Sequence, residues 1–118
     1  MYFKPSEFEC KCGCGDNKMD ADFLYQLNSL RATCDFPFVI SSGKRCKKHN
    51  TAVGGATQSA HLQGKAVDIK ARGIQAVEIV SEAVKHGFNG IGVNQSGGKK
   101  GRFIHIDTTH LDYNIWSY

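Results

Sequence analysis

Two short segments alternate apolar and polar residues, and this pattern limits the possible folds most. KAVDIK (residues 65–70) and RFIHIDT (residues 102–108) are rich in β-branched residues, and a period of two predicts half-buried β-strands. Asp68 lies on the polar face of the first strand, and His105 and Asp107 share one face of the second. The apolar faces of such strands must be covered, so we expect helices packed on a sheet.

The remaining segments predict these helices and further strands. Asp20 is a good N-cap for ADFLYQLNSLRAT, which carries apolar residues on one helical face. A second helix is expected in IQAVEIVSEAVKHG, which ends at Gly87. Its expected apolar face consists of Ile74, Val77, Val80 (with Ile79) and Val84. Other expected elements are a helical turn at 5–10 with Ser6 and Glu9 as a capping box, strands at 36–42 and 90–94, and a helical turn in the tail that docks Trp116 on the core. Helices followed by a small, mostly antiparallel sheet indicate an α+β fold, with residues 1–118 as a single domain.

Length and charge limit the classes of function. The 118 residues form about one ordinary domain, and no apolar run is long enough to span a membrane. The N-terminus lacks the apolar stretch of a signal peptide, so we expect synthesis in the cytoplasm and a separate route of release. A net charge of +4 favours acidic polymers such as nucleic acid or bacterial wall. The lysine clusters at 44–49 and 98–102 contain no aromatic residues, which argues against a single-stranded nucleic-acid groove.

The cysteines give a weaker signal. Their number, five, is odd, so at least one is unpaired within the chain. Three form the run CKCGCG (Cys10, Cys12 and Cys14), and Cys34 and Cys46 stand alone. This spacing is tighter than that of zinc ribbons, and a second pair is missing, so a structural zinc site is not favoured. We expect reduced, partly buried thiols, with a disulfide formed after release as the alternative.

The polar strand residues suggest a metal site. His61 and Asp68 flank Gly64 in SAHLQGKAVD, so a bend there could bring both side chains to one concave surface. His105 and Asp107 come from another strand. Two histidines and one carboxylate are a common ligand set for catalytic zinc, whose fourth position is left to water. Burial of Asp68 and His105 without partners would be costly, which favours a shared site.

Four segments resemble a known family. SGKR (42–45), SAHLQGKAVDI (59–69), GIGV (90–93) and FIHIDT (103–108) are similar to the zinc D-alanyl-D-alanine carboxypeptidase and L-alanyl-D-glutamate endopeptidase family, in its small phage-type or bacterial members. The signature SxHxxGxAxD is complete, with Ser59, His61, Gly64, Ala66 and Asp68. The resemblance covers residues 5–108. It implies a hedgehog/DD-peptidase-like fold, a zinc ion (Zn2+) in a cleft, and peptidoglycan stem peptides as substrate.

The same resemblance implies roles for individual residues. His61 and Asp68 would be the first two zinc ligands and His105 the third. His110 is the alternative third ligand, because DTTH places it three residues after Asp107. If His105 binds zinc, Asp107 is either the general base or a group that orients the site. The acid that the family usually has three residues before this histidine is replaced by Arg102, so the identity of the base stays open.

Two further residues are expected on the substrate side. Arg45 matches the arginine of the family's SGxR motif and would hold a substrate carboxylate through its guanidinium fork. The alternative is an ordinary loop arginine. Ser59 is expected to support the loop of His61 by a hydrogen bond.

The leading hypothesis is a zinc peptidase that cleaves peptidoglycan stem peptides or cross-links, as a carboxypeptidase or an endolysin-type endopeptidase that reaches the bacterial wall through a holin-type pore. The alternative is a zinc-binding module without hydrolysis, which the missing acid at position 102 favours and Asp107 opposes. A specific nucleic-acid-binding protein is a third hypothesis, but it leaves SxHxxGxAxD without a purpose. Oligomeric state does not follow from the sequence.

Overall fold

The strands form one five-stranded sheet. The computed structural model describes all residues, 1–118. The strand order is β1-β2-β4-β3-β5, with antiparallel pairing throughout except that β5 runs parallel to β3. The strands are β1 (Val39–Ser42), β2 (Ala66–Lys70), β3 (Gly90–Asn94), β4 (Phe103–Asp107) and β5 (Asn114–Ser117). The expected α+β fold with a mostly antiparallel sheet is confirmed.

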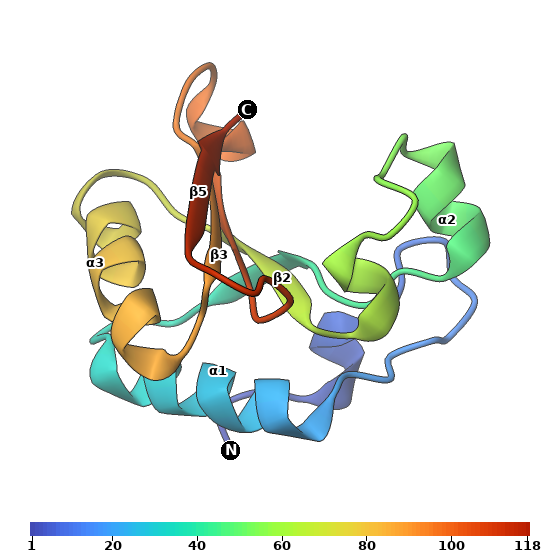
Figure 1. The fold of residues 1–118 in the computed structure, drawn as a ribbon, viewed down its shortest axis with the longest axis horizontal. Helices are drawn as coiled ribbons and strands as arrows, with labels where there is room; N and C mark the ends of the chain where they lie inside the picture. Colours follow the sequence, from blue (N-terminus) through green and yellow to red (C-terminus); the bar gives the residue numbers. More distant parts are fainter.

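The two faces of the sheet have different roles because side chains alternate along each strand. In the central pair, Val67 lies opposite Ile106, and Asp68 lies opposite His105. The apolar positions join a core cluster of 18 buried residues that includes side chains from α1 (Ala21–Thr33) and α3 (Gly73–Ala83). Figure 1 shows α1 running beneath the sheet and α3 beside it. The opposite face of β2, β4 and β3 carries Asp68, His105 and Asp107, with Gly90 and Gly92 beside them.

The first helix begins as the sequence predicts. The Asp20 carboxylate accepts a hydrogen bond from the N–H of Phe23 at 3.0 Å, which satisfies one of the free donors in the first turn. Phe23, Leu27 and Leu30 are buried in the core.

The apolar face expected for α3 is wrong in part. Ile74 and Val77 are 79% and 61% exposed and Val84 is also exposed, whereas Ile79 is fully buried and Val80 packs against the core. The buried residues of this helix are Ala76, Ile79 and Ala83. Two of these are alanines, whose small side chains let the helix approach the sheet closely. The larger β-branched residues are therefore displaced to the side. Gly87 follows the helix with φ of +87°, as expected of a residue that ends a helix.

At both ends of the chain the structure differs from the elements that the sequence predicts. The N-terminal turn is present at Pro5–Phe8, but the capping partners are Lys4 and Glu7 rather than Ser6 and Glu9, since the N–H of Lys4 donates to the Glu7 carboxylate at 2.7 Å. The tail forms strand β5 instead of a helical turn. The edge of β3 offers unpaired main-chain groups to the tail, and β5 satisfies them along Gly90–Val93. Trp116 therefore lies opposite Gly92 rather than on the core.

Two short helical segments form a separate lobe. They are α2 (Lys47–Ala52) and the turn Ala60–Gln63. Figure 1 shows this lobe on the right, facing β5 and the end of the chain. The remaining turns are Val84–His86 and Lys99–Gly101. None of the helices has the length and apolar character that crossing a membrane would require.

Candidate metal centre

A tight bend brings His61 and Asp68 together. The turn Ala60–Gln63 ends at Gly64, whose φ of +68° is a left-handed conformation that glycine adopts without strain. A Cβ at this position would lie 2.6 Å from the carbonyl oxygen of Lys18, so space as well as conformation requires glycine. The chain then enters β2, and both His61 and Asp68 are buried, at 3% and 8% exposure. The expected bend is confirmed.

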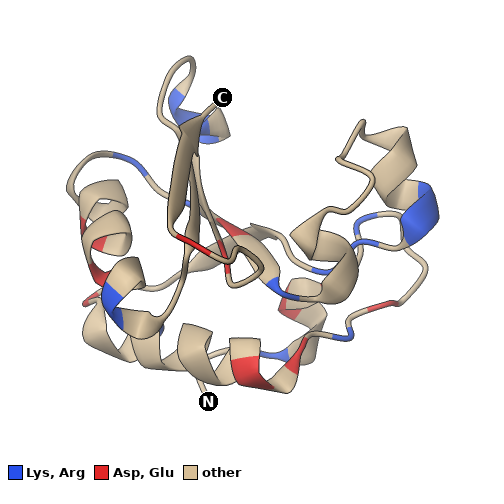
Figure 2. Ribbon diagram, in the orientation of Figure 1, with Lys and Arg blue, Asp and Glu red and all other residues tan.

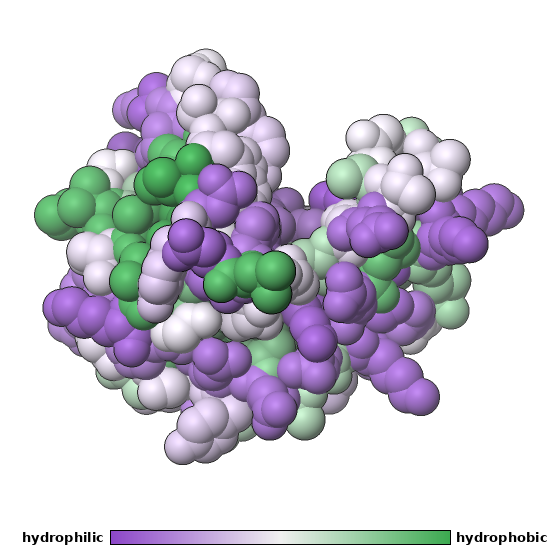
Figure 3. Space-filling view, viewed as in Figure 1, coloured by the Kyte–Doolittle hydropathy of each residue, from purple (hydrophilic) through white to green (hydrophobic).

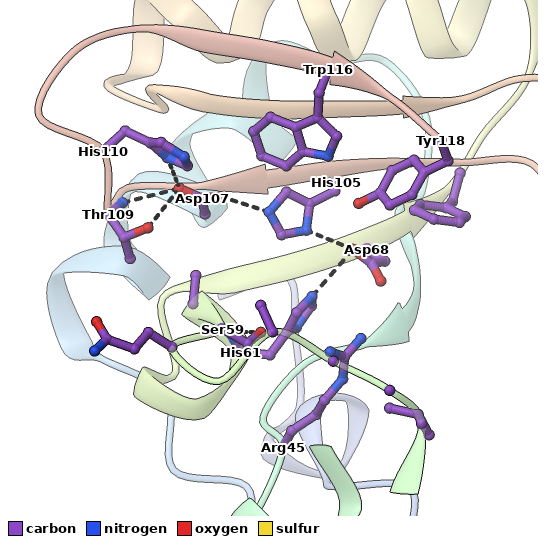
Figure 4. Close-up of a pocket in the computed structure, with 17 residues that line it drawn as sticks. Arg45, Ser59, His61, Asp68, His105, Asp107, Thr109, His110, Trp116 and Tyr118 are labelled. Carbon is purple, nitrogen blue, oxygen red and sulfur yellow. Dashed lines mark hydrogen bonds and ion pairs between the residues drawn. The ribbon is translucent and has the colours of Figure 1, made fainter. Parts of the chain in front are cut away.

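Three donor groups converge on one point between the turn and the sheet. Asp68 Oδ1 lies 3.4 Å from His61 Nε2 and 2.9 Å from His105 Nδ1. One donor atom from each of these residues lies within 4.8 Å of the others. Figure 4 shows the three side chains pointing toward one another from separate backbone segments. The structure thus brings together the two histidines and the carboxylate that the sequence singled out.

The hydrogen bonds of His61 fix which of its nitrogens is free. Its Nδ1 lies 2.8 Å from the carbonyl oxygen of Gly43. A carbonyl oxygen only accepts, so Nδ1 carries the proton and neutral His61 presents a lone pair on Nε2. This lone pair and the Asp68 carboxylate are both acceptors and face each other, an arrangement that suits a cation. Tetrahedral zinc ligands about 2.0–2.1 Å from the metal are about 3.3 Å apart, close to the observed spacing.

Asp107 holds the other side of His105. Its Oδ2 lies 2.6 Å from His105 Nε2. Its Oδ1 accepts hydrogen bonds from the N–H and the hydroxyl of Thr109, both at 3.1 Å. Burial raises the pKa of Asp107, but the interactions with His105 and the Thr109 N–H outweigh it and lower that pKa to about 2. Burial lowers the pKa of His105, but Asp107 and Asp68 outweigh it and raise that pKa to about 9.

His110 lies outside the group of three. Its ring Nδ1 is 2.9 Å from Asp107 Oδ1, and its backbone N–H donates to the side-chain oxygen of Asn89 at 3.1 Å. Its Nε2 has no hydrogen-bond partner in the protein, and the side chain, 32% exposed, lines the adjoining cleft. The structure therefore places His110 behind Asp107 rather than beside His61 and Asp68.

The site opens into a cleft of about 570 Å³. Figure 3 shows the molecular surface hollowed between the lobe of α2 and the sheet. Arg45 lines this cleft, and its guanidinium donates to Asn50 Oδ1 at 3.3 Å. Ser59 Oγ accepts a hydrogen bond from the N–H of His61 at 3.2 Å, as expected for a residue that supports this loop. Arg102 lies away from the cleft and donates to the carbonyl oxygen of Gly97.

Two further residues of the cleft, Trp116 and Tyr118, were not expected there from the sequence. Trp116 and Tyr118 form an aromatic wall opposite Arg45, as Figure 4 shows. The wall fits because β3 carries glycine on this face: a Cβ on Gly92 would lie 2.7 Å from Trp116 Nε1, and one on Gly90 would collide with Asp107 and His110. The alternation of glycine and apolar residues in GIGV is a signal for this, because it indicates a strand with one crowded face.

Asn50 is another residue whose role the sequence does not indicate. It is buried, and besides accepting from Arg45 it donates to the carbonyl oxygen of Ala56 at 2.8 Å. A Cβ on Gly55 would collide with its side chain. Asn50 thus links the loop of residues 53–56 to the guanidinium of Arg45. No local pattern distinguishes it from the exposed residues around it.

Comparisons with known proteins agree with this geometry. The sequence model of the family described as Peptidase M15 matches residues 1–107. The zinc D-Ala-D-Ala carboxypeptidase of Streptomyces albus G is 32% identical over 99 residues, which cover 80% of this chain and 36% of the relative. The chain thus spans about a third of the length of that relative. The metal in the relative's name agrees with the zinc expected from the ligand set. A family match over residues 1–107, on a chain that holds two histidines and a carboxylate in one cleft, shows that this chain belongs to the Peptidase M15 family.

Proposed function

We propose that this protein is a zinc peptidase that cleaves peptide bonds in the stem peptides of bacterial peptidoglycan. The observation that carries the proposal is the convergence of His61 Nε2, Asp68 Oδ1 and His105 Nδ1 beside a cleft that also contains Arg45. These three groups would hold the zinc ion. Zinc bound there supplies Lewis acidity, which polarises a peptide carbonyl and makes a water molecule a better nucleophile.

Asp107 acts in this proposal by orienting two histidines. Its Oδ1 is engaged by Thr109 and His110, and its Oδ2 by His105. A carboxylate that accepts from the second nitrogen of a ligand histidine fixes the ring and makes it a better ligand. Of the two roles that the sequence left open for Asp107, base or orienting group, these contacts favour the second.

His110 is then the group that moves the proton. Its Nδ1–H donates to Asp107, which leaves the lone pair of Nε2 free at the cleft. A carboxylate that holds one imidazole nitrogen so that the other can accept a proton is a common arrangement in hydrolases. His110 Nε2 would accept a proton from the attacking water and donate it to the leaving amine.

Arg45 and the aromatic wall would bind the substrate. Asn50 and the loop around it hold Arg45 at the cleft, where its guanidinium could pair with a substrate carboxylate. Trp116 and Tyr118 would pack on the peptide from the other side. The relative's name supports a peptide that ends in D-Ala-D-Ala. Exposed lysines lie on both sides of the cleft, at Lys47 and Lys48 on α2 and at Lys99 and Lys100 (Figure 2), and would favour an anionic wall.

A pair of synthetic peptides tests the proposal. Purified protein would be incubated with a stem pentapeptide ending in D-Ala-D-Ala and with the same peptide carrying a C-terminal amide, and the products identified by mass spectrometry. We expect loss of the terminal D-Ala from the free acid, and a large rise in KM for the Arg45→Lys variant with this peptide alone. Cleavage of the amide at an internal bond would identify an endopeptidase instead. No cleavage of either peptide or of intact peptidoglycan by zinc-loaded protein would reject the peptidase.

One observation favours a second candidate, a zinc-binding module without hydrolysis. No carboxylate without partners faces the group of three, since Asp107 is held by His105, Thr109 and His110, and position 102 holds an arginine that points elsewhere. Tight binding of the pentapeptide by the zinc-loaded protein without product would support this candidate.

A further inference from the structure

A second group of metal-binding side chains lies outside the cleft. The sulfur atoms of Cys10, Cys12, Cys14 and Cys46 all lie within 4.8 Å of one another. Three come from the N-terminal loop, and the fourth comes from the residue that precedes α2. The fifth cysteine, Cys34, is buried in the core at the end of α1. Four of the five cysteines therefore form one cluster, and the fifth packs in the core.

We propose that these four cysteines bind a structural zinc ion, separate from the metal of the cleft. The sulfur of Cys10 lies 3.5 Å from that of Cys12 and 3.8 Å from that of Cys46, and Cys12 and Cys46 are 3.6 Å apart. Four thiolates about 2.3 Å from a tetrahedral zinc ion have sulfur–sulfur distances of about 3.8 Å. A disulfide needs about 2.0 Å, so the observed spacing suits a shared metal and not a bond between two sulfurs.

The backbone supports the sulfurs as it does in thiolate sites. The N–H of Cys46 points to the sulfur of Cys10, and the N–H of His49 points to that of Cys46, both at 3.4 Å. Such hydrogen bonds stabilise negative charge on sulfur. Gly13 has φ of +83°, a left-handed conformation that lets the loop reverse between the cysteines. The tight spacing that argued against a zinc ribbon is thus accommodated, because the fourth sulfur comes from elsewhere in the chain.

Positively charged residues lie near the four cysteines in the sequence. Zinc with four thiolates has a net charge of about −2. Lys11 lies between two of the cysteines, and Lys47 and Lys48 directly follow Cys46. Lys44 lies two residues before Cys46 and pairs with Asp16 of the same N-terminal loop at 2.9 Å. The charge of Lys44 is already balanced by Asp16, so the lysines that would offset a zinc–thiolate centre are Lys11, Lys47 and Lys48.

The site joins the N-terminal loop to the segment that supports the cleft. Cys46 directly follows Arg45. The carbonyl of Gly43, three residues before Cys46, fixes the ring of His61. The N–H of Arg45 donates to the carbonyl oxygen of His61 at 3.1 Å. The N–H of Lys44 donates to the carbonyl oxygen of Phe8 at 2.9 Å. A metal at the four sulfurs would hold this segment in place, so its loss would displace Arg45 and weaken the contacts that Gly43 and Arg45 make with His61.

Metal analysis separates the two sites. We expect two zinc ions per chain in the purified wild type, and one in Cys12→Ser and in Cys46→Ser. Cys34→Ser is the matched control and should keep both. His61→Ala should keep one ion, and cobalt exchanged into that variant should show the near-ultraviolet charge-transfer band of cobalt–thiolate bonds. This last result does not depend on peptidase activity, so it tests the thiolate site even if the proposed function fails.

The cobalt spectrum tests the site even if a cysteine variant fails to fold, because His61→Ala keeps all four cysteines. Cys12→Ser is also expected to fold, because Cys12 is exposed and its replacement removes only one sulfur. Zinc content that is equal in wild type and in Cys12→Ser would overturn the proposal. So would a disulfide among the four cysteines in protein purified without reductant, or a cobalt-substituted His61→Ala variant without the thiolate band.

Discussion

Asp107 Oδ2 lies 2.6 Å from His105 Nε2, whereas the other nitrogen of the same ring faces Asp68 at 2.9 Å. One imidazole thus bridges two buried carboxylates. When a metal takes the place of the proton on Nδ1, the hydrogen bond from Nε2 to Asp107 remains. The pairing therefore fixes the ring in the orientation that a ligand needs.

Replacing Asp107 should weaken metal binding without removing a ligand. We expect Asp107→Asn to lower zinc affinity about 10–100-fold, because outer partners of ligand histidines have effects of this size. Competition with a chromophoric chelator measures the change. Asp112→Asn alters an exposed acid of the same tail and should leave the affinity unchanged. Equal affinity in both variants would remove Asp107 from the support of the site.

Adding a methyl group at Gly92 should disturb the aromatic wall alone. A Cβ there would lie 2.7 Å from Trp116 Nε1 and 2.9 Å from the hydroxyl of Tyr118, so both rings must shift. We expect Gly92→Ala to raise KM for a stem peptide about tenfold, which corresponds to about 1.4 kcal/mol, with unchanged zinc content. Gly98→Ala is the control because a Cβ there meets nothing within 4 Å. An unaltered KM in Gly92→Ala would show that the wall does not contact substrate.

The N-cap of α1 should contribute to stability in the usual range. Asp20→Ala removes the acceptor of the Phe23 N–H, so we expect the free energy of unfolding to fall by about 1 kcal/mol. Asp22→Ala, an exposed acid in the first turn that caps nothing, should have a smaller effect. Urea denaturation of both variants gives the comparison. A larger loss in Asp22→Ala would contradict the assignment of the cap.

The metal-free protein should become less stable as the pH rises above neutrality. The pKa of His105 is raised from 6.5 to about 9, because Asp107 and Asp68 outweigh the opposing effect of burial. The stabilisation by this protonated ring is full below pH 6.5 and is lost as the pH rises toward 9. Melting temperatures in the presence of a chelator should fall over that range. His105→Gln should lack the fall, and a parallel fall in that variant would assign it to another group.

Strand alternation made the central part of the site predictable. The alternation of apolar and polar residues in KAVDIK and RFIHIDT places Asp68 and His105 on one face of the sheet. The register of β2 and β4 puts them opposite each other. Glycine at position 64 marked the bend that adds His61. These are local rules, and they hold here because each strand has one buried apolar face.

Other features depend on contacts between distant segments. The tail became a strand because an edge of β3 was free, and nothing in HLDYNIWSY itself indicates that partner. The buried face of α3 includes Ala76 and Ala83 beside the expected Ile79, because small side chains let the helix pack closely on the sheet. The thiolate group escaped prediction for the same reason, since Cys46 joins CKCGCG only after the chain has folded.

Zinc content measured beside peptide cleavage in His105→Ala and His110→Ala tests the central claim most directly. The assignment of His61, Asp68 and His105 as ligands, with His110 as the group that moves the proton, has a definite consequence. His105→Ala should lose the metal of the cleft and all cleavage, whereas His110→Ala should retain that metal and lose cleavage. Loss of the metal from His110→Ala, with retention in His105→Ala, would contradict the account and make His110 the third ligand.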